Sequence, residues 1–191
     1  MDSKTLLIDC DMRRPMVHNL FYVKRENGLS KYLTDGGIPL SKIVKPSGVK
    51  NLDLITSGHV PPNPSELLAS QRMDRLIEEV KQEYDYIIFD SPPLIAVTDA
   101  MILAKKVDAI VLVIRTGITD RGIIDRGKTL LENIGVTAAG VVVNGIEVKR
   151  YYSGYKYYYY YYYYYYTDED KKGGKKKRRK HHRHSKIFGK S

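Results

Sequence analysis

The stretch that decides the fold reads Tyr84-Asp85-Tyr86-Ile87-Ile88-Phe89-Asp90-Ser91-Pro92-Pro93. Its apolar residues 87–89 form a short run of the kind that is buried on both faces of a parallel sheet. The run ends at Asp90, and the two prolines prevent the strand from continuing. A carboxylate at the carboxyl end of a buried parallel strand points into the crevice where open α/β sheets bind ligands. Asp90 is therefore a candidate ligand residue, and a cap or turn former before the prolines is the alternative interpretation.

The start of the chain repeats this design in Leu6-Leu7-Ile8-Asp9-Cys10-Asp11-Met12-Arg13-Arg14-Pro15. Two such strand ends side by side would form an acidic pocket suited to Mg²⁺ and phosphates. Asp9 and Asp11 could instead be strand-end turn residues, but carboxylates beside a buried strand are costly without cations. Arg13 and Arg14 either bind phosphate or neutralise the aspartates, and the sequence leaves both roles open. The two stretches together predict phosphoryl transfer.

Strands and helices alternate along the chain. Apolar runs predict strands over residues 5–9, 52–56, 85–90, 109–114 and 141–144, with the strand at 109–114 expected to be buried. Helical spacing predicts helices over residues 64–81, 98–105 and 120–133, with shorter helical pieces between residues 20 and 33. Asn63, Pro64 and Glu66 have the spacing of an N-cap, a first helical residue and a capping box. This alternation predicts an α/β fold whose parallel sheet is covered by helices on both faces.

The charge of the chain is concentrated at one end. Residues 1–150 contain 20 Lys and Arg against 19 Asp and Glu, whereas residues 151–191 contain 12 against 3. The body is thus a near-neutral globule of one domain, and the basic segment could meet anionic surfaces non-specifically, with no specific nucleic-acid target. The single cysteine, Cys10, excludes a disulfide framework and suits a reducing cytosol. The longest aliphatic run, 109–114, is too short to span a bilayer.

After residue 150 the composition changes completely. Tyr151, Tyr152 and Tyr155 lead into ten consecutive tyrosines, which run from Tyr157 to Tyr166. An acidic patch follows over 167–170, and a run rich in Lys, Arg and His follows that. No helical or strand period could bury so many tyrosines in one direction, so we expect a disordered tail. A repeat expansion without chemistry is the alternative for the run of ten, whereas the spacing of the first three tyrosines favours phosphate acceptors.

A Walker A pattern, G-x-x-x-x-G-K-[ST], occurs at residues 122–129. A P-loop needs glycine-rich backbone between a strand and a helix, because that backbone presents N–H groups to phosphate. Here Ile123, Ile124, Asp125 and Arg126 stand between the glycines, and the isoleucines belong to a helical apolar stripe. We therefore interpret the match as part of an amphipathic helix whose Lys128 faces solvent.

Residues 6–13 resemble the Walker A′ box of the bacterial tyrosine kinases of capsule and exopolysaccharide systems, and residues 87–93 resemble their Walker B box. The element at 61–68 and the terminal tyrosine cluster are also similar to that family. Together these features cover residues 4–166. Their combination is specific to the kinase family, because partition and septum-placement ATPases share only the two boxes. The resemblance implies a P-loop NTPase-like kinase domain over residues 1–150, a tyrosine-rich autophosphorylation tail over 151–170 and a basic disordered tail over 171–191.

The same resemblance implies ATP-dependent autophosphorylation, in which one subunit of a ring-forming homo-oligomer acts on its neighbour. Asp90 and Asp11 would hold Mg²⁺, and Asp9 and Asp11 would help to activate the attacking phenol, which when free loses its proton near pH ~10. Asn144 and Arg13 would contact the nucleotide. The partner would be a membrane-spanning polysaccharide co-polymerase or activator, which places the protein in the cytoplasm at the inner face of the plasma membrane. The acceptors would be tail tyrosines, namely Tyr151, Tyr152, Tyr155, Tyr157, Tyr158, Tyr159 and Tyr160.

One part of the family pattern is not found in these 191 residues. The P-loop of the family and its strand precede the A′ box, as does an arginine-bearing helix that builds the ring. Without the P-loop lysine and backbone amides, no evident group binds the β- and γ-phosphates of ATP. We expect an N-terminally truncated sheet with exposed apolar edges, and a chain that is weak or inactive as a kinase as written.

Two other functions fit part of the sequence. A partition-type ATPase acts by ATP-switched dimerisation and would have no use for the tyrosines. A non-catalytic interaction module would display a tail that other kinases modify or that binds anionic surfaces. The module predicts no ATP-dependent thermal shift, and surface binding that falls steeply with salt.

Overall fold

The structure is a computed structural model that describes residues 2–35 and 37–146. The strands are β1 (Thr5–Asp9), β2 (Val44–Pro46), β3 (Leu52–Ile55), β4 (Tyr86–Asp90), β5 (Val111–Arg115) and β6 (Gly140–Asn144). The helices are α1 (Val17–Leu20), α2 (Leu29–Thr34), α3 (Pro64–Ala69), α4 (Gln71–Val80), α5 (Asp99–Ala104) and α6 (Arg121–Asn133), with a 3₁₀ turn η1 (Leu40–Lys42). None of the described helices combines the length and the apolar character needed to cross a membrane. The predicted tail segments, 151–170 and 171–191, lie outside the described residues.

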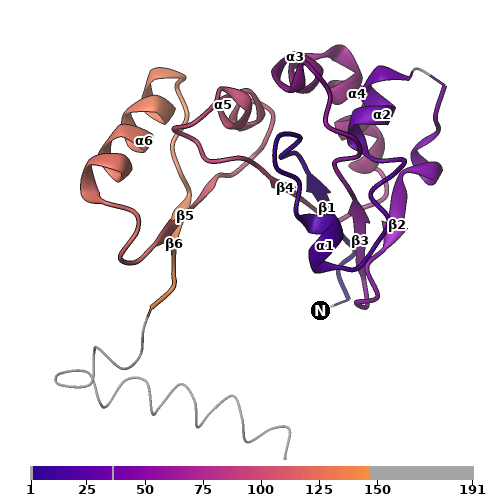
Figure 1. The fold of residues 1–191 in the computed structure, drawn as a ribbon, viewed down its shortest axis with the longest axis horizontal. Helices are drawn as coiled ribbons and strands as arrows, with labels where there is room; N and C mark the ends of the chain where they lie inside the picture. The colour runs from indigo at the N-terminus through magenta and orange to yellow at the C-terminus, as the bar shows by residue number, and fades with distance from the viewer. Residues whose placement is uncertain (1, 36, 147–191) are drawn as a thin grey trace, which may run out of the picture. The chain divides into compact units, whose positions relative to one another are not determined.

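Four strands form one sheet in the order β2-β3-β1-β4, and Figure 1 shows β1 between β3 and β4. β1 runs parallel to both neighbours, so that Ile8 lies opposite Ile55 on one side and Phe89 on the other. β2 adds an antiparallel edge beside β3, and β5 and β6 form a second, parallel pair. The predicted α/β fold with a parallel sheet is confirmed. The three-residue β2, which ends at Pro46, has no counterpart among the predicted strands.

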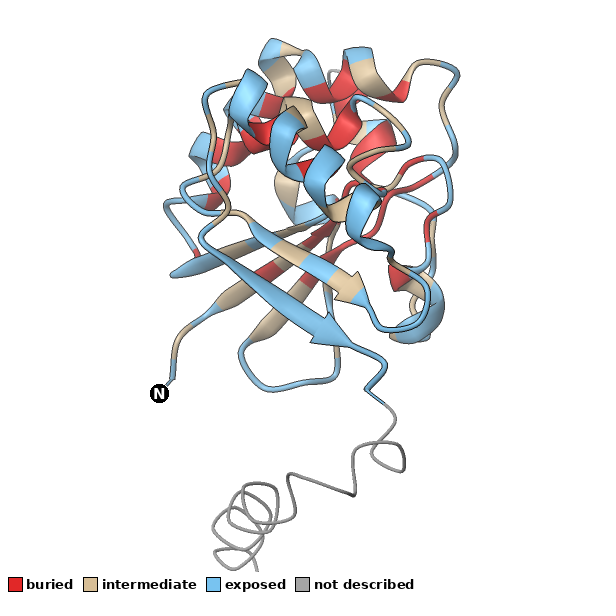
Figure 2. Ribbon diagram, turned by 90° about the vertical axis from the view of Figure 1, so that its left-hand side faces the viewer, coloured by how far each residue is buried: buried red, intermediate tan, exposed pale blue. Residues whose placement is uncertain are grey.

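The hydrophobic core lies against one face of the four-stranded sheet. Leu6 and Ile8 of β1 are fully buried, and they belong to one cluster with apolar side chains of α2, α3, α4 and α5. Figure 2 shows these buried positions where the helices meet the strands. Each large aliphatic side chain removed from water contributes about 1.5–3 kcal/mol. Packing of the helices on β1 therefore fixes the strand that carries the first two aspartates.

The opposite face is exposed at β4, and so is the β5–β6 pair. Tyr86 and Ile88 of β4 keep 60% and 52% of their surface exposed, and Val113 of β5 keeps 67%. β6 is exposed along its whole length (Figure 2). The prediction of a buried strand over 109–114 is therefore wrong. β5 begins at Val111 and alternates between half-buried and exposed residues, because it hydrogen-bonds to β6 alone among the described strands and packs on one face.

The predicted single helix over 64–81 is two helices, because the backbone is extended at Ser70 (ψ 154°). The Ser70 hydroxyl donates to the carbonyl of Leu67 (2.7 Å) and accepts a hydrogen bond from the Met73 N–H (3.4 Å). One serine therefore ends α3 and caps α4. This arrangement corrects the prediction of a continuous helix.

The predicted helix starts are confirmed in position but not in every hydrogen bond. Pro64 opens α3 as expected, but Glu66 accepts from the side-chain amide of Asn63 (2.6 Å) and Asn63 makes no side-chain cap, so the predicted capping box is not formed. At α6 the carboxylate of Asp120 accepts from the Ile123 N–H (2.9 Å) and caps the helix. The amphipathic helix predicted over residues 120–133 thus begins where its sequence indicates.

The Walker A pattern at residues 122–129 lies inside α6. Lys128 is exposed and pairs with Glu132 one turn later (3.6 Å). The helix is followed by Gly135, which has a positive φ of 73° and ends the turn. The interpretation of this match as a helix rather than a phosphate-binding loop is confirmed.

Candidate functional site

Two aspartates end neighbouring strands of the sheet. Asp9 closes β1 and Asp90 closes β4, and the strand register pairs them directly. The ladder continues for one more residue, where the Cys10 N–H donates to the carbonyl of Asp90 (2.8 Å). Adjacent strands lie about 4.8 Å apart, so both carboxylates leave the same edge of the sheet. The structure thus brings together the ends of the two stretches that the sequence singled out.

Asp9 is fully buried, yet only one of its carboxylate oxygens has a partner. Oδ2 accepts a hydrogen bond from the backbone N–H of Val17, the first residue of α1 (3.3 Å). Oδ1 has no hydrogen-bond partner among the described residues. A buried carboxylate oxygen without a partner is costly. Such an atom is suited to bind a cation or a donor from a ligand.

Two of the carboxyl groups at this edge, those of Asp9 and Asp90, have raised pKa values. Burial, followed by the charge of Asp90, raises the pKa of Asp9 from 3.8 to about 6, although the N–H groups of Val17 and Asp11 lower it. Burial and the charge of Asp11 also raise the pKa of Asp90. No Lys or Arg side chain lowers either pKa. Asp9, Asp11 and Asp90 are called the acidic group below. The pKa of Arg13 is raised chiefly by its hydrogen bond to Asp99 and also by the charge of Asp11, but no Lys or Arg side chain forms an ion pair with the acidic group among the described residues.

Asp11 shapes the turn that follows β1. Its Oδ1 accepts hydrogen bonds from the backbone N–H groups of Arg13 (3.0 Å) and Arg14 (2.8 Å). Its other oxygen makes no hydrogen bond within the described ranges. Asp11 is therefore a turn former through one oxygen, and its predicted metal contact stays a prediction.

Arg13 is bound to a carboxylate outside the acidic group. Its Nε donates to Asp99 Oδ2 (2.8 Å), and its Nη2 donates to Asp99 Oδ1 (3.1 Å) and to Ser65 Oγ (3.1 Å). The Ser65 hydroxyl donates to Asp99 Oδ1 (2.5 Å). Burial would raise the pKa of Asp99, but the hydrogen bonds from Arg13 and Ser65 and the charge of Arg13 hold it below its usual value. Arg13 therefore neutralises Asp99, and its predicted contact with a nucleotide stays a prediction.

The roles of Asp99 and Ser65 were not predicted from the sequence. Asp99 is the first residue of α5, so an aspartate at this position indicates a helix cap. Its real partner, Arg13, lies 86 positions away in the chain, and no local spacing can indicate such a pair. Burial of the carboxylate is the property that demands a cation, and burial becomes visible only in the fold.

The remaining predicted site residues do not join the acidic group. Asn144 ends β6, lies opposite Arg115 of β5, and accepts a hydrogen bond from the Gly145 N–H through its side-chain oxygen (2.7 Å). No hydrogen bond connects it to the aspartates in the part of the chain that the structure describes. The predicted acceptors from Tyr151 to Tyr160 lie outside the described residues.

The acidic group fits a magnesium ion as a partial set of ligands. Mg²⁺ prefers oxygen ligands and is usually held by one or two carboxylates together with substrate phosphates and water. Over residues 2–35 and 37–146, no three His, Cys, Asp or Glu side chains are arranged to hold a metal by themselves. The unpartnered oxygen of Asp9, and the raised pKa values of Asp9 and Asp90 with no cation to lower them, match this partial role.

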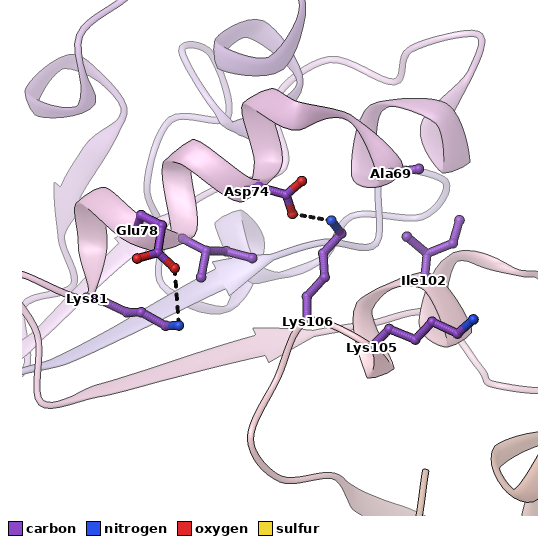
Figure 3. Close-up of a pocket in the computed structure, with 8 residues that line it drawn as sticks. Ala69, Asp74, Glu78, Lys81, Ile102, Lys105 and Lys106 are labelled. Carbon is purple, nitrogen blue, oxygen red and sulfur yellow. Dashed lines mark hydrogen bonds and ion pairs between the residues drawn. The ribbon is translucent and has the colours of Figure 1, made fainter. Parts of the chain in front are cut away.

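A pocket of about 440 Å³ lies elsewhere, between α4 and α5 (Figure 3). Two of its lysines already have acidic partners, since Lys106 pairs with Asp74 and Lys81 pairs with Glu78 (3.4 Å). The pocket is on the helix layer, whereas ligands of open α/β sheets bind at the carboxyl ends of the strands. The acidic group is therefore the stronger candidate. The pocket is lined by Ala69, Asp74, Ile77, Glu78, Lys81, Ile102, Lys105 and Lys106.

Comparison with known proteins places this site in a family context. Residues 1–135 match the family described as AAA domain. The chain is 42% identical over 156 residues to tyrosine-protein kinase Etk of Escherichia coli K12, and the match covers 82% of the chain but 21% of Etk. CapB of Staphylococcus aureus is 38% identical over 154 residues, which cover 81% of the chain and 67% of CapB. The chain thus spans about a fifth of the length of one relative and two thirds of the other.

Solved structures agree with these matches. The kinase domain of Escherichia coli tyrosine kinase Etk has a TM-score of 0.72 at 43% identity, over 76% of this chain and 56% of that domain. The septum site-determining protein MinD of Pyrococcus horikoshii, solved with Mg-ADP, has a TM-score of 0.60 at 20% identity, over 74% of this chain and 58% of MinD. At that identity, the likeness to MinD shows a shared fold alone.

Proposed function

Since the chain belongs to the family of bacterial tyrosine-protein kinases, as the two boxes together with the tyrosine cluster predict, we propose that it provides the acidic group of an ATP-dependent protein-tyrosine kinase. The kinase would phosphorylate tyrosines of its own kind of chain. Control of capsule or exopolysaccharide production is the role that the family resemblance favours. ATP and Mg²⁺ would be the cofactors.

One observation carries this proposal. Asp9 and Asp90 lie in register at the carboxyl ends of adjacent parallel strands, and Asp9 keeps a buried oxygen without a partner among the described residues. Bound Mg²⁺ would neutralise charge on the phosphates during phosphoryl transfer. Asp90 and Asp11 would hold it, because the charge of Asp11 acts on Asp90 and one oxygen of Asp11 has no hydrogen-bond partner among the described residues.

The chain's own residues would also prepare the phenol for attack. A free phenol loses its proton only near pH ~10, so a base close to neutral pH must accept that proton. The pKa of Asp9 is about 6, which makes its carboxylate a stronger base than an ordinary aspartate at the same pH. Asp9 and Asp11 would accept the proton from the phenolic oxygen, and the negative charge of the carboxylate would orient the hydroxyl beforehand.

Two residues would contact the nucleotide, and the tail would supply the acceptors. The side chain of Arg13 is 40% exposed, and its Nη1 makes no hydrogen bond within the described ranges, so it can bind a phosphate while it stays paired with Asp99. Asn144 would contact the base. The acceptors would be Tyr151, Tyr152, Tyr155, Tyr157, Tyr158, Tyr159 and Tyr160.

The proposed setting is the cytoplasmic face of the plasma membrane. We expect a ring of identical subunits that works with a membrane-spanning polysaccharide co-polymerase or activator. The resemblance to the kinases of capsule and exopolysaccharide systems favours this setting. The run of Lys and Arg within residues 171–191 would add attraction to anionic surfaces.

The proposal is tested by following phosphotyrosine on the purified chain during incubation with Mg-ATP. We expect Asp90→Asn and Asp11→Asn to lower the label by at least about tenfold, because Asn keeps the size of the side chain but lacks the charge that binds the metal. Asp74→Asn, which breaks the ion pair with Lys106 on the helix layer, is the matched control and should keep the label. Equal labelling of Asp90→Asn and wild type would contradict the proposal. Because the P-loop is not found in these 191 residues, an unlabelled wild-type chain is compared with the same chain extended by its upstream coding sequence, and no label in either would favour the interaction module.

A partition-type ATPase is the second candidate, because the fold is shared with MinD. This function would use the same acidic group but not the tyrosines. Deletion of residues 151–166 separates the two candidates. ATP hydrolysis that is unchanged by the deletion, with no phosphotyrosine in the parent chain, would favour the ATPase.

A further inference from the structure

Arg13, Ser65 and Asp99 form a closed hydrogen-bonded cluster, called the Asp99 cluster below. Arg13 makes two bonds to the carboxylate, at 2.8 and 3.1 Å, and Ser65 bridges the two partners through its hydroxyl group. The Asp99 side chain is fully buried, whereas the Arg13 side chain keeps 40% of its surface exposed. A bidentate pair of this kind fixes the plane of the guanidinium. Arg13 is therefore held in one orientation.

The Asp99 cluster joins the connections that leave three neighbouring strands. Arg13 lies in the connection after β1, Ser65 lies in the first turn of α3, which follows β3, and Asp99 begins α5, which follows β4. The acidic group lies at the carboxyl ends of two of these strands. A change in the cluster therefore acts beside the acidic group.

Arg13 begins beside the acidic group, yet its charge is used elsewhere. Its backbone N–H donates to Asp11 Oδ1 (3.0 Å), so its side chain starts next to this carboxylate. The guanidinium nevertheless binds Asp99. Asp9 Oδ1 is left without a partner among the described residues, and the pKa values of Asp9 and Asp90 are raised with no cation to lower them.

We propose that Asp99 is a positioning residue that holds Arg13 off the acidic group and so keeps this group free for a divalent cation. The inference rests on the proposed function, in which the acidic group holds the Mg²⁺ of the nucleotide. Without the Asp99 charge, the guanidinium would lose its partner and pair with Asp11. An arginine bound there would repel an incoming cation and occupy its ligand oxygens. Because arginine stays charged at all physiological pH values, only a competing carboxylate can restrain it.

The test is Asp99→Asn, which keeps the size of the side chain and removes its charge. Binding of Mn²⁺, a paramagnetic substitute for Mg²⁺, is titrated near neutral pH by electron paramagnetic resonance, and folding is checked by circular dichroism. We expect Asp99→Asn to weaken Mn²⁺ binding about tenfold. Adding Arg13→Gln to this variant removes the competing charge and should restore the affinity to within about twofold of wild type. Asp74→Asn, an exposed aspartate that also loses an ion pair, is the control and should bind Mn²⁺ like wild type.

A merely structural Asp99 would change the stability of these variants without changing the Mn²⁺ affinity of the folded protein. Wild-type affinity in Asp99→Asn, or no recovery in the double variant, overturns the inference. Ser65→Ala is a milder perturbation of the Asp99 cluster, because it removes the bridging hydroxyl and leaves Asp99 charged. It should weaken Mn²⁺ binding about two- to threefold, and unchanged affinity there counts against the inference even if Asp99→Asn fails to fold. A wild-type chain that binds Mn²⁺ neither alone nor with ADP, whose phosphates would complete the ligand set, overturns the proposed metal role itself, so the two failures are distinguishable.

Discussion

Asp9 places an ionisable group where water does not reach it. Its pKa is about 6 in the folded protein against 3.8 for a free side chain, so the folded state binds the proton more tightly than the unfolded state does. Ionisation of Asp9 therefore opposes folding. This unfavourable contribution is absent below about pH 4, grows between about pH 4 and 6, and is fully present at neutral pH. At neutral pH the fold thus tolerates a charge that a bound cation would neutralise.

We predict that Asp9→Asn raises the melting temperature at neutral pH but not near pH 4. Asparagine removes the ionisation and keeps an oxygen that can accept from the Val17 N–H. A gain of about 2–4 °C is expected by scanning calorimetry without divalent cations, because a stability change of 1 kcal/mol has that effect in a domain of this size. Asp125→Asn, on the exposed side of α6, should change nothing at either pH. An equal shift at both pH values would show that the effect is not ionisation.

At the scale of elements, the docking of α2 on the end of β3 depends on one glycine. The first two N–H groups of α2 donate to the carbonyls of Thr56 (2.7 Å) and Ser57 (2.9 Å), just beyond β3. A Cβ on Gly28 would lie 2.3 Å from both the backbone N of Gly58 and the carbonyl O of Thr56. Both contacts are with backbone atoms, which cannot turn aside as a flexible side chain can. The missing side chain therefore sets how closely the two elements approach.

We predict that Gly28→Ala lowers the free energy of unfolding by about 3 kcal/mol, because the added methyl group must push the two backbones apart. Urea denaturation, followed by circular dichroism, measures this loss. Gly140→Ala in β6 is the matched control, since a Cβ there meets no atom within 4 Å, and it should change the stability by less than about 1 kcal/mol. Similar losses in both variants would mean that general chain stiffness, rather than the close approach, is responsible.

Most elements could be predicted from sequence because each carries a local signal. Apolar runs locate β1, β3 and β4, and Asp120 and Gly135 bound α6. The break at Ser70 carries no comparable signal, since the apolar stripe of α3 continues into α4 and serine is tolerated inside helices. The exposure of β5 is equally hidden, because an aliphatic run looks the same whether one or both of its faces are covered.

The candidate site also contains some residues that the sequence predicts and others that only the fold reveals. Asp9 and Asp90 could be predicted, because each aspartate ends an apolar run and parallel strands end at the same edge of a sheet. The pairing of Arg13 with Asp99 could not, because it depends on how the connections after β1 and β4 meet. Local patterns thus predict where charges lie along the strands, and only the fold decides which charges neutralise each other.

At the scale of the whole molecule, exposed apolar side chains on the strands determine which faces of the described residues can associate with another molecule. β4 is an edge strand of its sheet, and β5 and β6 are each hydrogen-bonded on one side among the described strands. Unpaired backbone groups beside exposed apolar side chains favour the addition of another strand. The exposed side chains are Tyr86 and Ile88 on β4, Val111 and Val113 on β5, and Val141, Val142 and Val143 on β6.

We therefore predict that the purified chain self-associates as its concentration rises, and that Val113→Lys weakens this association. A lysine on the exposed face of β5 would have to lose its hydration if a second strand or sheet covered it, which is costly. Sedimentation velocity over a range of concentrations should show the midpoint of association moving about tenfold higher in Val113→Lys. Tyr22→Lys is the matched control, because Tyr22 is also apolar and 96% exposed but lies outside both sheets, and its midpoint should stay within about twofold of wild type. If the two variants shift the midpoint equally, the added positive charge acts through general repulsion between molecules. If only Val113→Lys shifts it, the uncovered strand face is the surface through which the molecules associate.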